Sequence, residues 1–488
     1  MKLCSNGVPL LHAIEDFDYM LMKLDRYDKI SLLLYIRWWN FLNELTINFS
    51  NKRLCSLILP LIVEQFLAIT VGLADSIMVA SVGEAAVSAV SLVDSINTLV
   101  FYGFAALATG GAVVCGQFIG SRDLKKANES AEQLLVFIVL LAAGLTAVLY
   151  ITKYFILHGL FGNIDQEVMD HANTYFIIVE ASIPFIALYN AGAALFRVMG
   201  NSSVSMRISI GMNIINVGGN ALLIFGFHMG VEGVAIPTLA SRIIGAIAVV
   251  WLLRNEKYTL HISKPFRCRL EGHIVKTILK LGVPSGLESS LFHLGKIMLL
   301  SVVSAFGTAS IAANAIGNSM ATFQILPAQA IGVGMITVVS QCVGAKDFES
   351  ARFYTKKLLK WSYLSMLAIN AVIFLILPLV INLYNVSDEA SHLAKLILWM
   401  HGGLGILLWP LSFTLPQTLK AAGDTTFVMG AAVASMWLFR IAAGVLLAKN
   451  FGFGVLGIWM AMFIDWIVRI IIFVLRYRGH KWENKYVR

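Results

Sequence analysis

The feature that most constrains this chain is an internal repeat. Residues 60–127 return as residues 284–351 at one constant spacing without a gap, because 284 − 60 = 224 and 351 − 127 = 224. The residues that recur are Pro60, Glu64, Gly83, Gln117, Gly120, Asp123 and Ala127, which pair with Pro284, Glu288, Gly307, Gln341, Gly344, Asp347 and Ala351. A repeat that keeps one register over this length indicates a duplicated structural unit.

The duplication extends beyond this block. LFRVMGNSS at 195–203 is similar to TLKAAGDTT at 418–426, and MGVEGVA at 229–235 is similar to FGVLGIW at 453–459. The chain is therefore predicted to fold as two related halves that together cover nearly all of residues 55–478.

The polarity of the chain places both halves in a membrane. Hydrophobic residues make up 58% of the 488 residues and charged residues only 13%, whereas soluble domains carry roughly 25% charged residues. The apolar residues form separate runs of about 20 residues, the length with which a helix crosses a hydrocarbon core of roughly 30 Å. We expect an all-α membrane protein with twelve transmembrane helices in two pseudo-symmetric six-helix lobes. The expected spans are 55–79, 86–118, 131–157, 171–198, 204–227, 233–254, 276–305, 310–343, 354–384, 390–420, 426–450 and 455–477.

The basic residues indicate how the chain is oriented. Lysines and arginines gather in alternate loops, which all lie on one face if there are twelve crossings, and the loops of the other face are neutral to acidic. The positive-inside rule then predicts a multi-pass protein of the cell membrane with both termini in the cytoplasm. An even number of spans in each half gives both halves the same orientation, so the repeat axis should run along the membrane normal. The formal net charge of +9 is explained by this topology, and no nucleic-acid binding is expected.

These observations divide the chain into five predicted segments. They are an N-terminal extension at 1–54, an N-lobe at 55–254, a cytoplasmic linker at 255–275, a C-lobe at 276–478 and a cytoplasmic tail at 479–488. The extension contains SLLLYIRWWNFLNEL, an apolar and aromatic stretch broken by charged and amide residues. An interfacial helix and a poorly ordered extension are equal alternatives for this stretch. No secretory signal is expected, because the start of the chain lacks a short apolar core before a cleavage site.

Polar residues inside the predicted spans of the first half form a set of oxygen ligands. A charge at the centre of a membrane helix costs on the order of 2.5–3.5 kcal/mol, so it usually faces a cavity or a partner. Asp75 lies in the first span, Asn216 and Asn220 lie one turn apart in the fifth, and Thr238 follows Pro237 in the sixth. This set suits a hard cation such as Na⁺, or a protonatable acid held by hydrogen bonds. The alternative is that the amides only hold helices together.

The second half is polar in a different way. Glu288 and Lys296 lie eight residues apart on one face of the seventh span and are candidates for an ion pair. Arg440 and Asp465 are interpreted as a structural ion pair. The candidates for a substrate cavity or for the interface between the lobes are Glu64, Glu288, Asn314, Asn318, Trp409 and Gln417. Methionines and aromatic residues are suited to lining an adaptable apolar cavity, although at helical spacing they are more often packing residues.

The sequence has no constellation typical of an enzyme. It contains no GxxxxGK[ST] loop for nucleotide phosphates, no HExxH and no GxSxG. Catalysis and ATP-driven transport by this chain are therefore not expected. Its five cysteines form no CxxC motif and no Cys/His cluster, and no cofactor is expected.

Taken together, these motifs resemble the multidrug and toxic compound extrusion (MATE) transporters. The resemblance covers residues 55–478 and is carried by LPLIVEQ with GLADSIMVASVGEAAVSAV, GQFIGSRD with its echo SQCVGAKD, NIINVGGNALLIFG followed by GVEGVAIPT, and LGVPSGLESSLF. It implies two six-helix lobes that open alternately to either face of the membrane. It also implies export of cationic or amphipathic compounds, driven by inward flow of Na⁺ or H⁺.

The resemblance further implies roles for single residues. The positions that match the N-lobe cation site of the family are Asp75, Asn216, Asn220 and Thr238. Asn220 departs from the family pattern, since many relatives carry Asp there, and this leaves Asp75 as the carboxylate that binds Na⁺ or H⁺. A C-lobe cation site is not expected. Trp409 lies near the place of the tenth-span acid, and Glu288 lies one turn before the usual acid of the seventh span.

Two other functions are weighed against this one. A lipid-linked precursor flippase of the same superfamily would need a cationic cavity, for which Lys296 and Arg440 are the obvious candidates. An intramembrane enzyme or a scaffold would need a reactive constellation or a soluble domain, and the sequence offers neither. The expected partners are small cationic or amphipathic substrates and membrane lipid, and the protein is expected to be a monomer.

Overall fold

Helices and the turns between them make up the part of the chain that the computed structural model describes. This part is residues 49–486 apart from 161, 163 and 263–269. No strand occurs within it. The predicted interfacial helix of the N-terminal extension lies outside the described residues.

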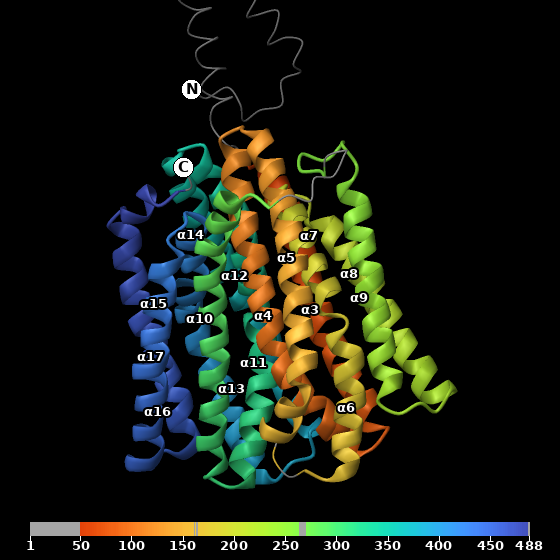
Figure 1. The fold of residues 1–488 in the computed structure, drawn as a ribbon. Helices are drawn as coiled ribbons and strands as arrows, with labels where there is room; N and C mark the ends of the chain where they lie inside the picture. Colours follow the sequence, from red (N-terminus) through yellow and green to blue (C-terminus); the bar gives the residue numbers. More distant parts are fainter. Residues whose placement is uncertain (1–48, 161, 163, 263–269, 487–488) are drawn as a thin grey trace, which may run out of the picture. The chain divides into compact units, whose positions relative to one another are not determined.

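The first half of the described chain runs from α3 to α9 (Figure 1). Its helices are α3 (Asn51–Ala80), α4 (Glu84–Gly120), α5 (Leu124–Tyr154), α6 (Gln166–Glu180), α7 (Ile183–Val198), α8 (Ser202–Ala221) and α9 (Glu232–Leu253). Two π-helical stretches, Phe155–Leu160 and Leu222–Gly226, extend α5 and α8.

The second half runs from α10 to α17 (Figure 1). Its helices are α10 (Gly272–Ser304), α11 (Thr308–Gly344), α12 (Phe348–Leu383), α13 (Asp388–Trp409), α14 (Leu415–Ala421), α15 (Thr425–Ser435), α16 (Ala443–Val445) and α17 (Gly454–Arg478). This half also has three π-helical stretches. Pro410–Thr414 joins α13 to α14, Met436–Ala442 joins α15 to α16, and Leu446–Asn450 extends α16.

Among the described residues, eleven helical segments are long and apolar enough to cross a membrane, or twelve if one bent pair counts as a single span. The bent pair is α6 with α7, which meet at an angle of 44°. The expected single span at 171–198 is therefore broken. Pro184 lies in the first turn of α7, where its missing N–H and its ring prevent a continuous helix. The predicted all-α membrane fold with two lobes is otherwise confirmed.

The motif GQFIGSRD and its counterpart SQCVGAKD, at the end of the second span of each half, form the same turn twice. Asp123 accepts a hydrogen bond from the Lys126 backbone nitrogen at 3.1 Å, and Asp347 accepts one from the Ser350 backbone nitrogen at 2.9 Å. Each aspartate therefore satisfies a backbone donor at the start of the next helix, α5 or α12. The bond from Lys126 also lowers the pKa of the Asp123 carboxyl group. The motif recurs because each half needs this turn between its second and third spans.

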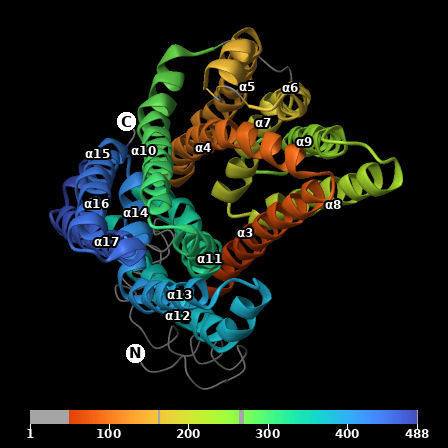
Figure 2. The ribbon, with the colours of Figure 1, turned by 90° about the horizontal axis from the view of Figure 1, so that it is seen from below.

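The two halves meet where α4 packs against α10 and α11, and where α3 packs against α11 (Figure 2). At the ends of α4 and α11 the backbones nearly touch. A Cβ atom on Gly120 would lie 1.9 Å from the Gln341 carbonyl oxygen, and one on Gly344 would lie 1.9 Å from the Gln117 carbonyl oxygen. We call these four residues the glycine contact. Only glycine permits such an approach. Because Gly120 and Gly344 are equivalent positions of the repeat, the same contact forms twice, once from each half.

Side chains of the glycine contact also bond across the lobes. Gln117 Nε2 donates to the Ala421 carbonyl at 2.8 Å, and Gln341 Nε2 donates to the Val198 carbonyl at 2.7 Å. Both carbonyls lie in the last turn of a helix, where no backbone donor is left to bond them. The two glutamines recur because each satisfies a helix end of the other lobe.

The duplicated glutamates also have equivalent partners. Glu64 Oε1 lies 2.7 Å from an Arg197 guanidinium nitrogen, and Glu288 Oε2 lies 2.8 Å from Lys420 Nζ. The expected pairing of Glu288 with Lys296 is wrong. Eight residues along a helix span about 12 Å, too far for a direct ion pair, whereas α14 brings Lys420 to Glu288. Both pairs tie the first helix of a lobe to a helix end in the same lobe.

Replacing Gly344 by alanine tests the glycine contact. The new methyl group would collide with the Gln117 carbonyl, so α4 and α11 should separate, at a cost of about 1–3 kcal/mol for overpacking. We expect a lower unfolding temperature and faster labelling of the buried Cys115 and Cys342 thiols by a water-soluble maleimide, read by peptide mass spectrometry. Gly144→Ala is the matched control, because nothing lies within 4 Å of its Cβ position. Equal labelling of both variants would contradict the assignment.

Candidate functional site

The N-lobe contains a polar cavity of about 360 Å³. Its walls come from α3, α4, α6 and α9. The charged and polar residues that line it include Asp75, Asp94, Asn97, Tyr175, Thr238 and Arg242. A carboxylate that lines a cavity inside a membrane protein is a candidate for binding an ion or a substrate.

The structure brings the four predicted N-lobe residues together. Asn220 Nδ2 donates to Asp75 Oδ1 at 2.7 Å, which links α8 to α3. Asn216 and Thr238 are hydrogen-bonded at 3.0 Å, which links α8 to α9. Asp75 is partly exposed toward the cavity, while Asn216, Asn220 and Thr238 are buried. The helical spacing of the two asparagines places both on the face that meets Asp75.

The Asn216 amide can face Asp75 with either end. With its oxygen toward Asp75, a hydrogen bond forms only if the carboxyl group carries a proton. With the amide turned over, its nitrogen lies 3.0 Å from Asp75 Oδ1 and its oxygen accepts from Thr238 Oγ1 at 3.0 Å. The same side chains can therefore hold Asp75 in its protonated or its ionised form.

A cation also fits this arrangement. Asn220 is fully buried, and its Oδ1 has no hydrogen-bond partner among the described residues. A buried amide oxygen without a donor is costly unless something binds it. Asp75, Asn220 and Thr238 carry carboxylate, amide and hydroxyl oxygens, which are the ligand types that a hard cation prefers.

Three charged residues of this lobe were not singled out from the sequence. Asp94 accepts a hydrogen bond from Tyr175 Oη at 3.2 Å. Glu180 has an exposed fraction of 0%, and neither of its carboxylate oxygens has a hydrogen-bond partner among the described residues. Arg242 donates to Ser182 Oγ at 2.6 Å. Each could have been found as a charge inside or at the end of an apolar span.

Arg242 is the counter-charge of this acidic cavity. Its guanidinium group lies over the Phe101 ring, 4.6 Å from the centroid. The groups with which it interacts electrostatically are Tyr175, Asp94, Glu180 and Asp75. One cation among three carboxylates leaves these named groups with an excess of negative charge, which protons or a bound cation can balance.

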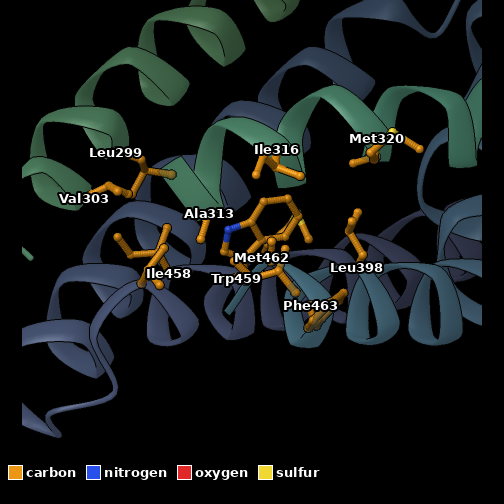
Figure 3. Packing of buried hydrophobic residues seen from close by; sticks show 14 of the residues in the cluster. Leu299, Val303, Ala313, Ile316, Met320, Leu398, Ile458, Trp459, Met462 and Phe463 are labelled. Carbon is orange, nitrogen blue, oxygen red and sulfur yellow. The ribbon is translucent and has the colours of Figure 1, made fainter. Parts of the chain in front are cut away.

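The C-lobe equivalent of the Asp75 position is apolar. At the spacing of the repeat, Leu299 corresponds to Asp75 and Met462 corresponds to Thr238, because 299 − 75 = 224 and 462 − 238 = 224. Both lie in a hydrophobic cluster with Ile316, Trp459 and Phe463 (Figure 3). Apolar side chains therefore fill the position in the C-lobe that corresponds to Asp75.

The C-lobe has its own cavity of about 370 Å³ against α4. Of the predicted residues, Glu288, Trp409 and Gln417 line it. Asn314 and Asn318 instead line a separate pocket of about 40 Å³. Glu64 is buried, and its carboxylate is held by Arg197 and by Ser205 Oγ at 3.1 Å, so its contacts are structural.

Asp465 has two arginine neighbours, and the expected partner, Arg440, is the more distant of them. Arg469 Nε lies 2.9 Å from Asp465 Oδ1, whereas the Arg440 guanidinium lies 4.0 Å from Asp465 Oδ2. Arg469 is one helical turn from Asp465 on α17 and reaches it directly. Arg440 is therefore less tightly held than the sequence suggested.

A duplicated helical membrane protein with a cavity in each lobe, polar in the N-lobe and largely aromatic in the C-lobe, is of the class of two-lobe membrane transporters. Each half matches the MatE family model, over residues 60–222 and 284–446. The chain belongs to the MatE family, which confirms the resemblance to the MATE transporters; members of this family are transporters and not enzymes.

Individual relatives agree with this assignment. The chain is 29% identical over 441 residues to the uncharacterized transporter YisQ of Bacillus subtilis (strain 168), covering 88% of this chain and 95% of that protein. It is 24% identical over 460 residues to the probable multidrug resistance protein NorM of Thermotoga maritima, covering 93% and 97%. A solved outward-facing structure of a multidrug resistance MATE family transporter shares the fold, with a TM-score of 0.80 at 21% identity over 88% of this chain and 95% of that one.

Arg242→Met tests the role of the counter-charge. Removing one partner from a buried charge cluster costs roughly 3–5 kcal/mol. The loss should be larger at alkaline than at acidic pH, because protonated Asp94 and Glu180 need no counter-charge. We expect the unfolding temperature to fall accordingly, and Glu180→Gln to restore part of it in the double variant. The exposed Arg207→Met is the control. A loss that does not depend on pH would contradict this role.

Proposed function

We propose that this chain is a secondary active antiporter that exports cationic or amphipathic compounds in exchange for Na⁺ or H⁺. The observation that carries the proposal is the hydrogen-bonded Asp75 group at the wall of the N-lobe cavity, with Asn220 at 2.7 Å. The group offers a carboxylate, amide oxygens and a hydroxyl, and it tolerates Asp75 in two protonation states. Membership of a family of multidrug efflux transporters supports the direction of transport.

Alternating access gives this group its role in the cycle. An ion drives the cycle only if it binds more tightly in one state of the lobes than in the other. The glycine contact closes the end of the bundle where α4 and α11 end. If both termini are cytoplasmic, as the basic loops suggest, this is the cytoplasmic end, and the ion reaches Asp75 from outside.

The substrate cavity proposed here lies where the lobes face each other. The C-lobe cavity of about 370 Å³ is bounded by Tyr102 of α4 and by Phe292, Trp409 and Phe413 of the C-lobe. Aromatic walls suit compounds with a flat apolar body. The four predicted N-lobe residues are the proposed ion site, and Glu288, Trp409 and Gln417 are proposed substrate neighbours. We further propose that the protein works as a monomer in the cell membrane.

A lipid-linked precursor flippase is the second candidate function. It is favoured by one observation, which is that Lys296 and Arg440 line the same pocket. The acidic N-lobe cavity favours the antiporter. The two functions differ in coupling, since a drug-stimulated ion flux belongs to the antiporter, and movement of a phosphate-linked lipid without an ion gradient belongs to the flippase.

Asp75→Asn tests the antiporter. In inverted membrane vesicles, the wild-type protein should accumulate ethidium when the lumen is made acidic or rich in Na⁺, with the two gradients imposed separately. Accumulation of ethidium that responds to only one of the two gradients would identify the coupling ion. The variant should lose accumulation, because an amide can neither release a proton nor supply an anionic ligand. Glu84→Gln, at an exposed acid, is the control. Unchanged coupling in Asp75→Asn would refute the proposed mechanism.

A further inference from the structure

Two cations of the C-lobe face a small pocket without a full complement of partners. Lys296 of α10 and Arg440 of the stretch Met436–Ala442 line the pocket of about 40 Å³. Among residues 49–486, as far as the structure describes them, Lys296 makes no ion pair or hydrogen bond. Arg440 is only 9% exposed, and its Nε has no hydrogen-bond partner within the described chain.

The acids nearby do not balance these cations. Asp465 accepts from Arg469 at 2.9 Å and from Ser435 Oγ, and it lies 4.0 Å from Arg440. Glu288 is paired with Lys420. Three cations, Lys296, Arg440 and Arg469, therefore share one carboxylate in this described part of the lobe. Arg440 is buried, and a buried charge without a full set of partners is costly. Lys296 is exposed and adds a second positive charge at the same pocket, so an anion bound there would be stabilised.

The pocket presents donors to such an anion. Trp459 Nε1 donates to Asn314 Oδ1 at 3.2 Å, which fixes the amide oxygen on that side and leaves its NH₂ group to donate elsewhere. The Lys296 ammonium and the Arg440 guanidinium supply charged donors, which bind oxyanions about twice as strongly as neutral donors do. A volume of about 40 Å³ has room for one small charged group.

The pocket adjoins the larger aromatic cavity. The Arg440 guanidinium lies 5.3 Å from the centroid of the Phe292 ring, and Phe292 lines the cavity of about 370 Å³. Lys296 is one helical turn beyond Phe292 on α10. A compound with its aromatic body in the larger cavity can therefore place a polar group in the small pocket.

We propose that the C-lobe binds an anionic group of the transported compound, a carboxylate, sulfonate or phosphate, between Lys296 and Arg440. This site rests on the proposed transport function for its role, and its binding can be tested separately. The N-lobe has no equivalent of the Lys296 cation, because Gly72 holds the corresponding position of the repeat (296 − 72 = 224). The substrate class is thereby extended to amphiphiles that carry a negative charge.

Two probes with one ring system test the site. Pyrene-1-sulfonate and pyrene-1-methylammonium carry opposite charges on the same aromatic body. Their binding to the purified full-length protein in nanodiscs is read by energy transfer from tryptophan. Lys296→Met should weaken sulfonate binding about tenfold or more, as expected for loss of one charged hydrogen bond, and should not weaken ammonium binding. Lys296→Arg should retain sulfonate binding, and Lys356→Met, at an exposed lysine, should have no effect.

Each outcome decides the proposal. Sulfonate binding that survives both Lys296→Met and Arg440→Met overturns it, as does an equal loss for both probes, which would mean general damage to the cavity. Displacement of the sulfonate by chloride, against a gluconate control, would assign the pocket to an inorganic anion and overturn the substrate role. Asp75→Asn should abolish gradient-driven transport while sulfonate binding persists, so a failure of the antiporter and a failure of this site are distinguishable.

Discussion

The structure depends on the approach of α4 to α11 at the glycine contact. Gly120 and Gly344 let each backbone touch a carbonyl of the other helix, and Gln117 and Gln341 bond the helix ends of the opposite lobe. Membrane helices gain no hydrophobic attraction from one another in lipid, so small residues and hydrogen bonds must hold them together. Opening this end would break both bonds and both close contacts at once. We therefore expect this contact to be either fully formed or fully broken, with few intermediate arrangements.

Residues that recur and residues that differ between the halves have different roles. The recurring glycines, glutamines and glutamates make equivalent contacts in both lobes, so duplication preserved the frame on which the lobes meet. The proposed ion site and the proposed anion site lie at positions where the halves diverge. Asp75 corresponds to Leu299 in the repeat, and Lys296 corresponds to Gly72. One lobe thus acquired a carboxylate and the other an ammonium group on the same scaffold.

The sequence was sufficient for the duplicated fold, for the spans other than 171–198 and for the grouping of Asp75 with Asn216, Asn220 and Thr238, because helical periodicity and the repeat constrain all of these. It was not sufficient for the ion pairs. Glu288 could be placed on a face of α10, but its partner depends on which helix end packs there, and that is Lys420 on α14. The same limit applies to Glu180, because a sequence does not show that its carboxylate is buried without a hydrogen-bond partner.

The charges of the two lobes bear on how ion binding and lobe movement are coupled in the proposed antiport. Of the groups named above, the N-lobe cavity carries more carboxylates than cations, and the C-lobe carries more cations than carboxylates. Electrostatic interactions are strong in a site from which water is excluded. In the proposed cycle, closing of the lobes over the cavity would bring the C-lobe cations nearer to Asp75, where they would compete with its bound ion. The proposal therefore expects the ion to be held more tightly in the open state, which is the difference in affinity that alternating access requires.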